Sequence, residues 1–292
     1  MLKNRLVIFS SMIVEAYDVG GTWMRGALVS PEGIFAREKE STQRDFLGQI
    51  RSLSRKLRMH GTPDCVSVAV PGPVKGDVLY GAPPLNRERS INIAKGLSGL
   101  EKKVFVENDL NAAALTEMHE GYGREWQSFY LLTISTGIGV GIVLKGRPVG
   151  GASGEFGHCN VNLRQFPLQC ACGRIGCWAA YASGPGIDNF AQKFYSITKE
   201  EVFEGKSLYA RAVLRFLRNV NARGLGIMVN ALDVQGIVVM GSLGLGQFEK
   251  IIPSKGNIRK YAFNSVPPIV RTELGDDIGL LGAYYVAQKP CE

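Results

Sequence analysis

The sequence contains no hydrophobic stretch that is long and apolar enough to span a membrane. An apolar run at residues 6–14 follows two basic residues and faintly resembles a signal peptide, but no cleavage site of small residues comes after it. The run passes directly into residues 17–21, which are typical of a strand that enters a turn. We therefore expect a cytoplasmic protein that has no membrane partner.

Signals of nucleic-acid binding are also absent, because the chain has neither zinc-finger spacing nor a basic stripe interleaved with aromatic residues. The net charge is +8, from 34 Lys and Arg and 26 Asp and Glu, which suits either a nucleic acid or an anionic substrate. Basic residues recur at helical spacing in residues 51–58 and 211–223, as they do on solvated helix faces. We expect no nucleic-acid partner.

The length of 292 residues is too great for one comfortable core, so two domains are expected. A strand, a glycine-rich turn and a second strand occur twice, about 115 residues apart, and strands alternate with helices after each pair. This order predicts an α/β architecture. The expected strands are residues 12–18, 24–30, 34–40, 65–70, 104–107, 129–135, 140–144 and 236–240, and the expected helices are residues 47–59, 110–118, 208–232 and 278–288.

Two turns have the composition of phosphate-binding loops. In the first, Gly20 and Gly21 let backbone N–H groups point at phosphate oxygens, Thr22 adds a hydroxyl donor, and Asp18 could orient hydrated Mg²⁺. The second contains Thr136 and Gly137. Each turn alone could be an ordinary hairpin, but one in each domain would hold a nucleotide between them. A Walker A motif is absent, because residues 205–207 lack the glycine required five residues earlier.

A carboxylate that could act as a general base follows the strand at residues 104–107. Asp109 lies at the start of a predicted helix, where it could accept a proton from an attacking hydroxyl. In phosphoryl transfer such a base mainly positions the nucleophile. The alternative is a helix N-cap, a position at which Asn108 and Asp109 are both favoured.

Cysteines cluster in one short segment, and the absence of a secretory signal favours metal over disulfides there. Cys170, Cys172 and Cys177 follow His158, and three thiolates with one imidazole make a closed, structural zinc site. Such a site would leave Glu155 free to face a substrate. The alternative is three reduced, buried thiols.

In this order, these elements resemble the ROK family of sugar kinases and sugar-responsive repressors. The resemblance covers nearly the whole chain from Met12, and its most specific part is the segment from Glu155 to Cys177. The matching pieces are residues 18–22, 71–73, 107–109, 111–114, 136–139, 155–158, 170–177, 241–242 and 278–283.

The resemblance implies an actin-like ATPase (ribonuclease H-like) fold, with two domains around a nucleotide cleft and a dimeric or tetrameric homo-oligomer. It implies a smaller domain at residues 1–106 and a larger one at 107–292 that carries the zinc loop, the adenosine side and the closing helix. ATP, Mg²⁺ and structural Zn²⁺ are the implied cofactors.

The resemblance also implies a role for each matching residue. Asp109 would take the proton from a sugar hydroxyl, usually O6, and His158 would use one ring nitrogen for zinc and the other for sugar. The implied sugar-binding residues are Gly72, Asn108, Asp109, Glu155 and His158. The implied nucleotide-binding residues are Asp18, Gly20, Gly21, Thr22, Thr136, Gly137 and Gly241.

Some positions depart from the family pattern. The family usually has a sugar-binding Glu where this chain has Ala179, many members have Asp at the position of Lys75, and the usual Trp near Asn86 is not evident. Losing a hydroxyl partner weakens selection for plain glucose, and the space opened could admit a C2 N-acetyl group. We therefore expect an N-acetylhexosamine, N-acetylmannosamine or N-acetylglucosamine, with glucose as the alternative. The fructokinase branch of the family tends to have a second His in the zinc loop where this chain has Cys172, which argues against fructose as the substrate.

Two other classes of function fit the sequence less well. A sugar-sensing repressor would carry a helix-turn-helix domain before the first turn, and only 17 residues precede Asp18. A catalytically dead sugar-binding protein is supported only by Ala179. Retention of Asp18, Thr22 and Asp109 favours a kinase, so an ATP-dependent sugar kinase is the expected function.

Overall fold

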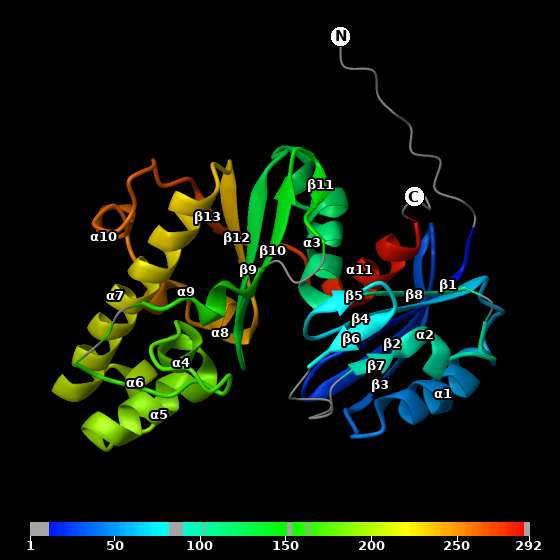
Figure 1. Cartoon of the computed structure of the whole chain (residues 1–292), viewed down its shortest axis with the longest axis horizontal. Coiled ribbons are helices and arrows are strands. Elements are labelled where there is room, and N and C mark those ends of the chain that lie inside the picture. Colours follow the sequence, from blue (N-terminus) through cyan, green and yellow to red (C-terminus); the bar gives the residue numbers. More distant parts are fainter. Residues whose placement is uncertain are drawn as a thin grey trace, which may run out of the picture. The chain divides into compact units, whose positions relative to one another are not determined.

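The computed structural model describes residues 12–81, 90–101, 103–150, 154–161, 163 and 165–288. Asn86 and Cys291 lie outside the described residues. The chain forms two compact units (Figure 1). Unit 1 contains residues 12–116, Gly150 and residues 274–288, and unit 2 contains residues 117–149 and 154–273.

Unit 1 is built on a five-stranded sheet in the order β3-β2-β1-β4-β8. β1 pairs antiparallel with β2 and parallel with β4, and β4 pairs parallel with β8. These strands are β1 (Val14–Val19), β2 (Trp23–Ser30), β3 (Gly33–Ser41), β4 (Cys65–Val70) and β8 (Val104–Asn108). A second, small sheet contains β5 (Val74–Lys75), β6 (Val78–Tyr80) and β7 (Ser90–Asn92).

Helices cover both faces of the larger sheet in unit 1. They are α1 (Phe46–Leu57), α2 (Ile93–Gly96), α3 (Asp109–Glu120) and α11 (Ile278–Ala287). Tyr17 and Val19 share a buried cluster with the apolar face of α1, whereas Asp18 points the other way, toward Gly279 of α11. Successive side chains of a strand alternate between faces. α1 and α11 therefore lie on opposite faces of β1.

Unit 2 repeats the strand pairing of unit 1 in a second sheet, which has the order β11-β10-β9-β12-β13. β9 pairs antiparallel with β10 and parallel with β12, just as β1 pairs with β2 and β4. The strands are β9 (Phe129–Ile134), β10 (Ile138–Leu144), β11 (Arg147–Pro148), β12 (Gly236–Met240) and β13 (Ile269–Arg271).

The helical elements of unit 2 surround this sheet. They are η1 (Tyr122–Arg124), η2 (Glu155–His158), α4 (Ala179–Ala182), α5 (Gly184–Tyr195), α6 (Lys199–Glu204), α7 (Leu208–Ala231), α8 (Ser242–Gly246), α9 (Phe248–Ile251) and α10 (Lys255–Ile258). Within the described ranges, no helix is both long enough and apolar enough to cross a membrane.

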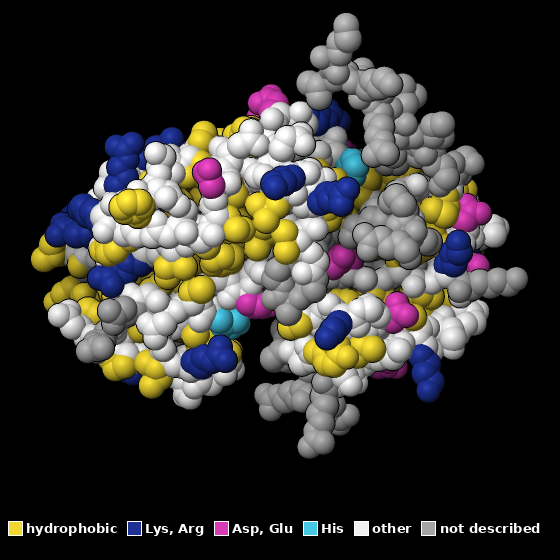
Figure 2. Space-filling view, turned by 45° about the horizontal axis from the view of Figure 1, so that its top comes forward, with side chains coloured by type: hydrophobic (Ala, Val, Ile, Leu, Met, Phe, Trp, Pro, Cys, Tyr) yellow, Lys and Arg dark blue, Asp and Glu magenta, His cyan; other side chains and the backbone are white. Residues whose placement is uncertain are grey.

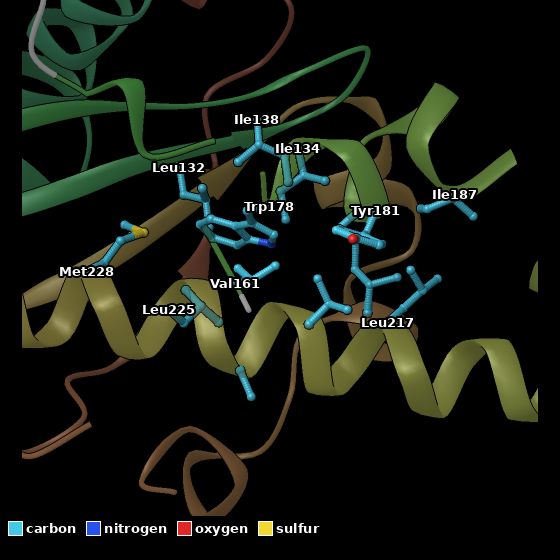
Figure 3. Close-up of a cluster of buried hydrophobic side chains, with 14 of the residues drawn as sticks. Leu132, Ile134, Ile138, Val161, Trp178, Tyr181, Ile187, Leu217, Leu225 and Met228 are labelled. Atoms are coloured by element: carbon cyan, nitrogen blue, oxygen red, sulfur yellow. The ribbon is translucent and has the colours of Figure 1, made fainter. Parts of the chain in front are cut away.

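Trp178 is a central residue of the unit 2 core (Figure 3). Its ring is fully buried and packs against Gly224 of α7, where even an added Cβ would lie 2.3 Å from the ring. The indole Nε1 donates to Asn221 Oδ1 at 2.7 Å, and Asn221 Nδ2 donates to the carbonyl of Ile251. Trp178 follows Cys177 directly, so this packing anchors one end of the cysteine-rich segment in the core.

The division into units differs from the expected boundary after residue 106. Residues 107–116 and 274–288 were expected in the second domain, but they belong to unit 1. The physical reason is non-local packing, because α11 lies against β1, β4 and β8. Gly282 of α11 also lies so close to α3 that a Cβ there would be 2.3 Å from the carbonyl oxygen of Ala112.

Candidate active site

The turn between β1 and β2 is tight and leaves its tip in solvent. Gly20 N donates to the carbonyl of Trp23 at 2.9 Å, and a Cβ on Gly20 would lie 2.8 Å from that oxygen. Thr42 Oγ1 donates to the carbonyl of Gly20 at 2.7 Å. Gly21 and Thr22 are exposed. These bonds fix the backbone at Gly20, and the exposed residues Gly21 and Thr22 remain accessible to a ligand.

Asp18 lies at the foot of this turn in a crowded environment. Arg25 Nη1 donates to Asp18 Oδ2 at 3.1 Å, and the Asp18 side chain is 16% exposed. Burial raises the pKa of this carboxyl above its usual range, although the Arg25 charge acts in the opposite direction. A Cβ on Gly279 would lie 2.5 Å from Asp18 Cγ, so only glycine leaves room for the carboxylate.

Asn108 and Asp109 lie where β8 meets α3, and Asn108 organises the junction. Asn108 Oδ1 accepts from the N–H groups of Leu110 and Asn111, which caps the helix. Its amide donates to the carbonyl of Gly72 at 3.0 Å and to Asp109 Oδ1 at 3.1 Å, so a sugar hydroxyl would have to replace one of these four bonds to contact Asn108. Gly72 has a φ of +108°, a conformation that favours glycine. The amide of Asn108 thus orients the carboxylate of Asp109.

In unit 2, the segment that carries Glu155 and His158 lies directly on β10. Val140 N donates to the carbonyl of Gly154 at 3.0 Å. A Cβ on Gly154 would lie 1.7 Å from the carbonyl oxygen of Val140, and one on Gly157 would lie 2.0 Å from that of Ile138. Both glycines are therefore required for this close approach.

His158, Cys170, Cys172 and Cys177 meet in one cluster, with their ligand atoms all within 4.8 Å of one another. His158 Nδ1 is 3.5 Å from Cys170 Sγ, and Cys172 Sγ is 3.7 Å from Cys177 Sγ. A tetrahedral Zn²⁺ with Zn–S bonds of about 2.3 Å separates its sulfur ligands by about 3.7 Å. The donor set and its spacing fit a structural zinc ion.

The other ring nitrogen of His158 faces Glu155. His158 Nε2 is 3.7 Å from Glu155 Oε2, and both side chains are partly exposed, at 35% and 48%. A ligand hydroxyl could therefore meet a nitrogen and a carboxylate oxygen together. Nδ1 of His158 therefore faces the metal cluster and Nε2 faces Glu155, and the expected contact of Nε2 with a sugar stays a prediction.

Thr136 lines a pocket of about 500 Å³ in unit 2, which also includes Ser135, Gly184, Asp188, Lys199 and Ser242. Ser135 Oγ lies 3.1 Å from Ser242 Oγ, and Gly184 N donates to the carbonyl of Ser135. Gly241 has a φ of +88°, and a Cβ there would lie 2.6 Å from the carbonyl oxygen of Ile134. Its backbone therefore packs directly against the end of β9.

The expected site residues thus fall into two groups. Unit 1 holds Asp18, Gly20, Gly21, Thr22, Gly72, Asn108 and Asp109, and unit 2 holds Thr136, Gly137, Glu155, His158, Cys170, Cys172, Cys177 and Gly241. Sequence reasoning gave no role to Arg25, Asp188 and Lys199, and it placed Gly279 only within a matching family segment, without its close approach to Asp18. Only Arg25 carried a usable signal, an opposite charge placed across a hairpin from Asp18.

The two departures from the family pattern within the described chain have different surroundings. Ala179 begins α4 and is half-buried against the core of unit 2, two residues after Cys177. Lys75 is exposed in β5 of unit 1. A change at residue 179 therefore affects a packed position beside the metal cluster, whereas a change at residue 75 affects an open surface.

Known proteins are similar to this chain in sequence and in structure. An N-acetylmannosamine kinase from Pasteurella multocida is 29% identical over 291 residues, covering 92% of this chain and 94% of the relative. A glucokinase from Aeropyrum pernix is 28% identical, with coverage of 94% and 97%. The crystal structure of a ROK hexokinase from Thermus thermophilus is 27% identical, with a TM-score of 0.79 and coverage of 94% and 97%.

These comparisons confirm the expected fold, which is that of the actin-like ATPases. The model of the ROK family matches residues 14–290, nearly the whole chain. The protein therefore belongs to the ROK family.

Proposed function

We propose that this ATP-dependent sugar kinase phosphorylates the O6 hydroxyl of an N-acetylhexosamine, either N-acetylmannosamine or N-acetylglucosamine. The observation that carries the kinase chemistry is the oriented carboxylate of Asp109 at the junction of β8 and α3. The observation that favours an N-acetylated sugar is Ala179. Relatives named N-acetylmannosamine kinase add support, and relatives named glucokinase keep glucose as the alternative.

The reaction is a direct, in-line transfer. Asp109 accepts the proton from the sugar hydroxyl while the sugar oxygen forms a bond to the γ-phosphorus of ATP. The bond from that phosphorus to the bridging oxygen breaks, and ADP leaves. Asn108 Nδ2 and Leu110 N both donate to Asp109 Oδ1, so the carboxylate is oriented before substrate binds. No phosphoenzyme is required.

Backbone and hydroxyl donors of the two glycine-rich turns hold the phosphates. Gly21 and Thr22 supply them from unit 1, where Gly20 shapes the turn through its own bond to Trp23, and Thr136 and Gly137 supply them from unit 2. Asp18 would hold hydrated Mg²⁺, which neutralises charge on the phosphates when it is bound. The pocket beside Thr136, together with Gly241, suits the adenosine end of the nucleotide.

The sugar is held by donors and acceptors at fixed positions. Glu155 and His158 Nε2 contact its hydroxyls from unit 2, and Asn108 and the backbone at Gly72 do so from unit 1. The zinc ion would be structural, because four protein ligands leave no open coordination position. ATP as the donor fits a cytoplasmic enzyme. As in other family members, we expect a dimer or tetramer.

Restoring the family carboxylate tests the role of Ala179 in sugar choice. Ala179→Glu should shift the ratio of kcat/KM values toward glucose by about tenfold or more, since a new buried acceptor selects for a hydroxyl over an N-acetyl group. The exposed Lys75→Asp is the matched control, and its ratio should stay unchanged. An unchanged ratio in a folded Ala179→Glu enzyme would contradict the assignment.

The first assay of the wild-type enzyme is ADP release with glucose, N-acetylglucosamine, N-acetylmannosamine, mannose and fructose. Turnover of one N-acetylhexosamine with little turnover of glucose is the expected result. A preference for glucose would make Ala179 a tolerated loss and establish the glucokinase alternative. Silence on all five sugars with intact ATP binding would favour a non-catalytic, sugar-sensing protein.

A further inference from the structure

The net positive charge of this protein arises in one part of the chain. Residues 205–272 contain ten Lys and Arg but only two Asp and Glu, whereas the rest of the chain contains 24 of each. The whole net charge of +8 therefore belongs to residues 205–272 of unit 2, which begin just before α7 and end just after β13. The Lys and Arg residues of this segment take no part in the proposed chemistry, whereas Gly241 and Ser242 lie at the proposed adenosine pocket.

Within this segment, residues 254–265 form an exposed tip between α9 and β13. Its exposed side chains include Lys255, Arg259 and Lys260, and the ring of Phe263 is 98% exposed. Ile258 and Val266 are buried and attach the tip to the core of unit 2. We call residues 254–265 the basic tip.

The backbone beneath Phe263 is held firmly by α7. Asn230 Oδ1 accepts from Phe263 N at 2.7 Å, and Asn230 Nδ2 donates to the carbonyl of Tyr261 at 3.0 Å. Asn264 Nδ2 donates to the carbonyl of Val229, and Asn219 Nδ2 donates to the hydroxyl of Tyr261. The exposure of the Phe263 ring is thus built into the fold and is not the property of a loose loop.

The charges of the basic tip are not neutralised by neighbouring carboxylates. Within the described parts of the chain, Lys255, Arg259 and Lys260 make no ion pair. Nearby, Arg218 donates to the carbonyl oxygens of Lys250 and Glu249, so its positive charge is also uncompensated. Figure 2 shows Lys and Arg side chains gathered at one end of unit 2, at the left of the view, beside exposed apolar side chains.

The C-terminal end of α1 in unit 1 also combines an exposed apolar side chain with basic residues, but there the basic residues are paired with carboxylates. Met59 is 80% exposed there and also has basic neighbours. Arg58, however, pairs with Glu15 at 2.8 Å and with Glu101 at 3.2 Å, and Lys56 pairs with Glu40 at 2.7 Å. Single exposed apolar side chains are common and need no explanation. The combination of a fixed, exposed ring with uncompensated cations is found at the basic tip.

We propose that the basic tip docks on an anionic phospholipid surface, with the Phe263 ring inserted among the headgroups. Aromatic side chains favour that interface, and each Lys or Arg near an anionic membrane strengthens binding by about fivefold. A soluble polyanion that carries no bases or other apolar groups would use the cations but would have no use for an exposed phenyl ring. The proposal departs from the expectation of no membrane partner and is independent of the kinase activity.

Co-sedimentation with vesicles at physiological ionic strength tests the proposal. The vesicles contain phosphatidylcholine alone or phosphatidylcholine with phosphatidylglycerol. The variants are Phe263→Ser and the triple change of Lys255, Arg259 and Lys260 to Gln. Matched controls are Met59→Ser and the triple change of Arg44, Arg55 and Lys103 to Gln, which removes the same charge from unit 1. Light scattering and sugar-dependent ADP release accompany each protein.

The expected result is binding to the anionic vesicles only. The triple change in the tip should weaken binding by about a hundredfold and Phe263→Ser by about tenfold, while both controls stay within about twofold of wild type. ADP release should be unchanged throughout. Equal losses in tip and control triples, or equal binding to neutral vesicles, would overturn the proposal. So would a Phe263→Ser variant that binds like wild type, or one that changes only the oligomeric state.

Discussion

At the scale of single residues, the junction of β8 and α3 reconciles two interpretations of Asn108 and Asp109. The sequence allowed either a helix cap or a catalytic base. Asn108 Oδ1 makes the capping bonds to Leu110 N and Asn111 N, which places Asp109 in the first turn of the helix. A carboxylate is favourable there, near the positive end of the helix dipole. Capping and catalysis are therefore compatible.

A second carboxyl has no assigned role in the chemistry but controls stability. Glu117 is fully buried, accepting from Thr272 Oγ1 at 2.7 Å and from Tyr122 N at 3.0 Å. Burial raises the pKa of Glu117 above its usual range, although both hydrogen bonds act in the opposite direction. The folded state therefore binds the proton more tightly than the unfolded state. Stability is full below the unfolded pKa and falls as pH rises through the folded pKa.

Glu117→Gln should remove that loss of stability. The amide has nearly the same shape, its oxygen can accept from Tyr122 N, and its NH₂ group can donate to the Thr272 hydroxyl. We expect a melting temperature that falls less steeply than that of wild type as the pH rises above the ordinary Glu pKa of about 4.3. Thermal melts across this range measure it. A Gln variant with the same pH slope as wild type would show that Glu117 does not titrate in this window.

Several residues around the candidate site could be predicted from sequence, and others could not. Gly20, Gly21 and Thr22 were identifiable because glycine pairs between apolar runs mark tight turns. Gly279 was not, because its close approach to Asp18 joins residues that are far apart in the chain. Composition near one residue carries no information about such a non-local contact.

At the scale of elements, two glycines determine where the segment with Glu155 and His158 can lie. Gly154 has a φ of +92°, and its missing side chain lets η2 rest on β10. Gly154→Ala should cost about 1–3 kcal/mol or more from strain alone, in addition to the clash with the Val140 carbonyl. Activity should fall with it, since the same segment carries the proposed sugar ligands.

Chemical denaturation and assays of kcat/KM measure the stability and activity of Gly154→Ala, and Gly246→Ala is the matched control. Gly246 ends α8 with open space around its Cβ position and no positive φ, so alanine there should be neutral or slightly stabilising. If the Gly154 and Gly246 variants were equally stable and active, the close approach to β10 would be irrelevant to function.

The long helices and the two hairpins could be predicted from the sequence pattern, whereas the short helices and strands could not. The long helix at residues 208–232 and the two hairpins were expected, and the structure has α7 at Leu208–Ala231 with the hairpins β1–β2 and β9–β10. Apolar periodicity needs a window of many residues. The four-residue helices α4 and α10 and the small sheet of β5 to β7 are too short to produce one.

At the scale of the whole molecule, each unit has its own core. One buried cluster includes Tyr17, Leu28 and Leu53 of unit 1, and another includes Trp178, Leu217 and Ile237 of unit 2. The division between the units was expected after residue 106, but α11 returns from the end of the chain to pack in unit 1. Sequence order alone did not reveal that return.

The metal cluster lies wholly in unit 2, so loss of the metal should destabilise unit 2 first. Cys172→Ser should lower the bound zinc and reduce the melting temperature by about 5–10 °C. Cys159→Ser is the matched control, because Cys159 is a free cysteine outside the cluster. Metal analysis and thermal melts check both. A Cys172→Ser enzyme with unchanged stability and full activity without metal would contradict a structural zinc.

The most direct measurement is sugar-dependent ADP release by the wild-type enzyme and by Asp109→Asn, with N-acetylmannosamine and N-acetylglucosamine as substrates. The asparagine side chain keeps the shape of the carboxylate and can still accept from Leu110 N, so the variant should fold with an unchanged melting temperature. We predict sugar-stimulated ADP release by wild type and a loss of about 10²–10⁴-fold in kcat for the variant. A variant with near-normal turnover, or a wild-type enzyme that binds ATP without any sugar-stimulated release, would contradict the account.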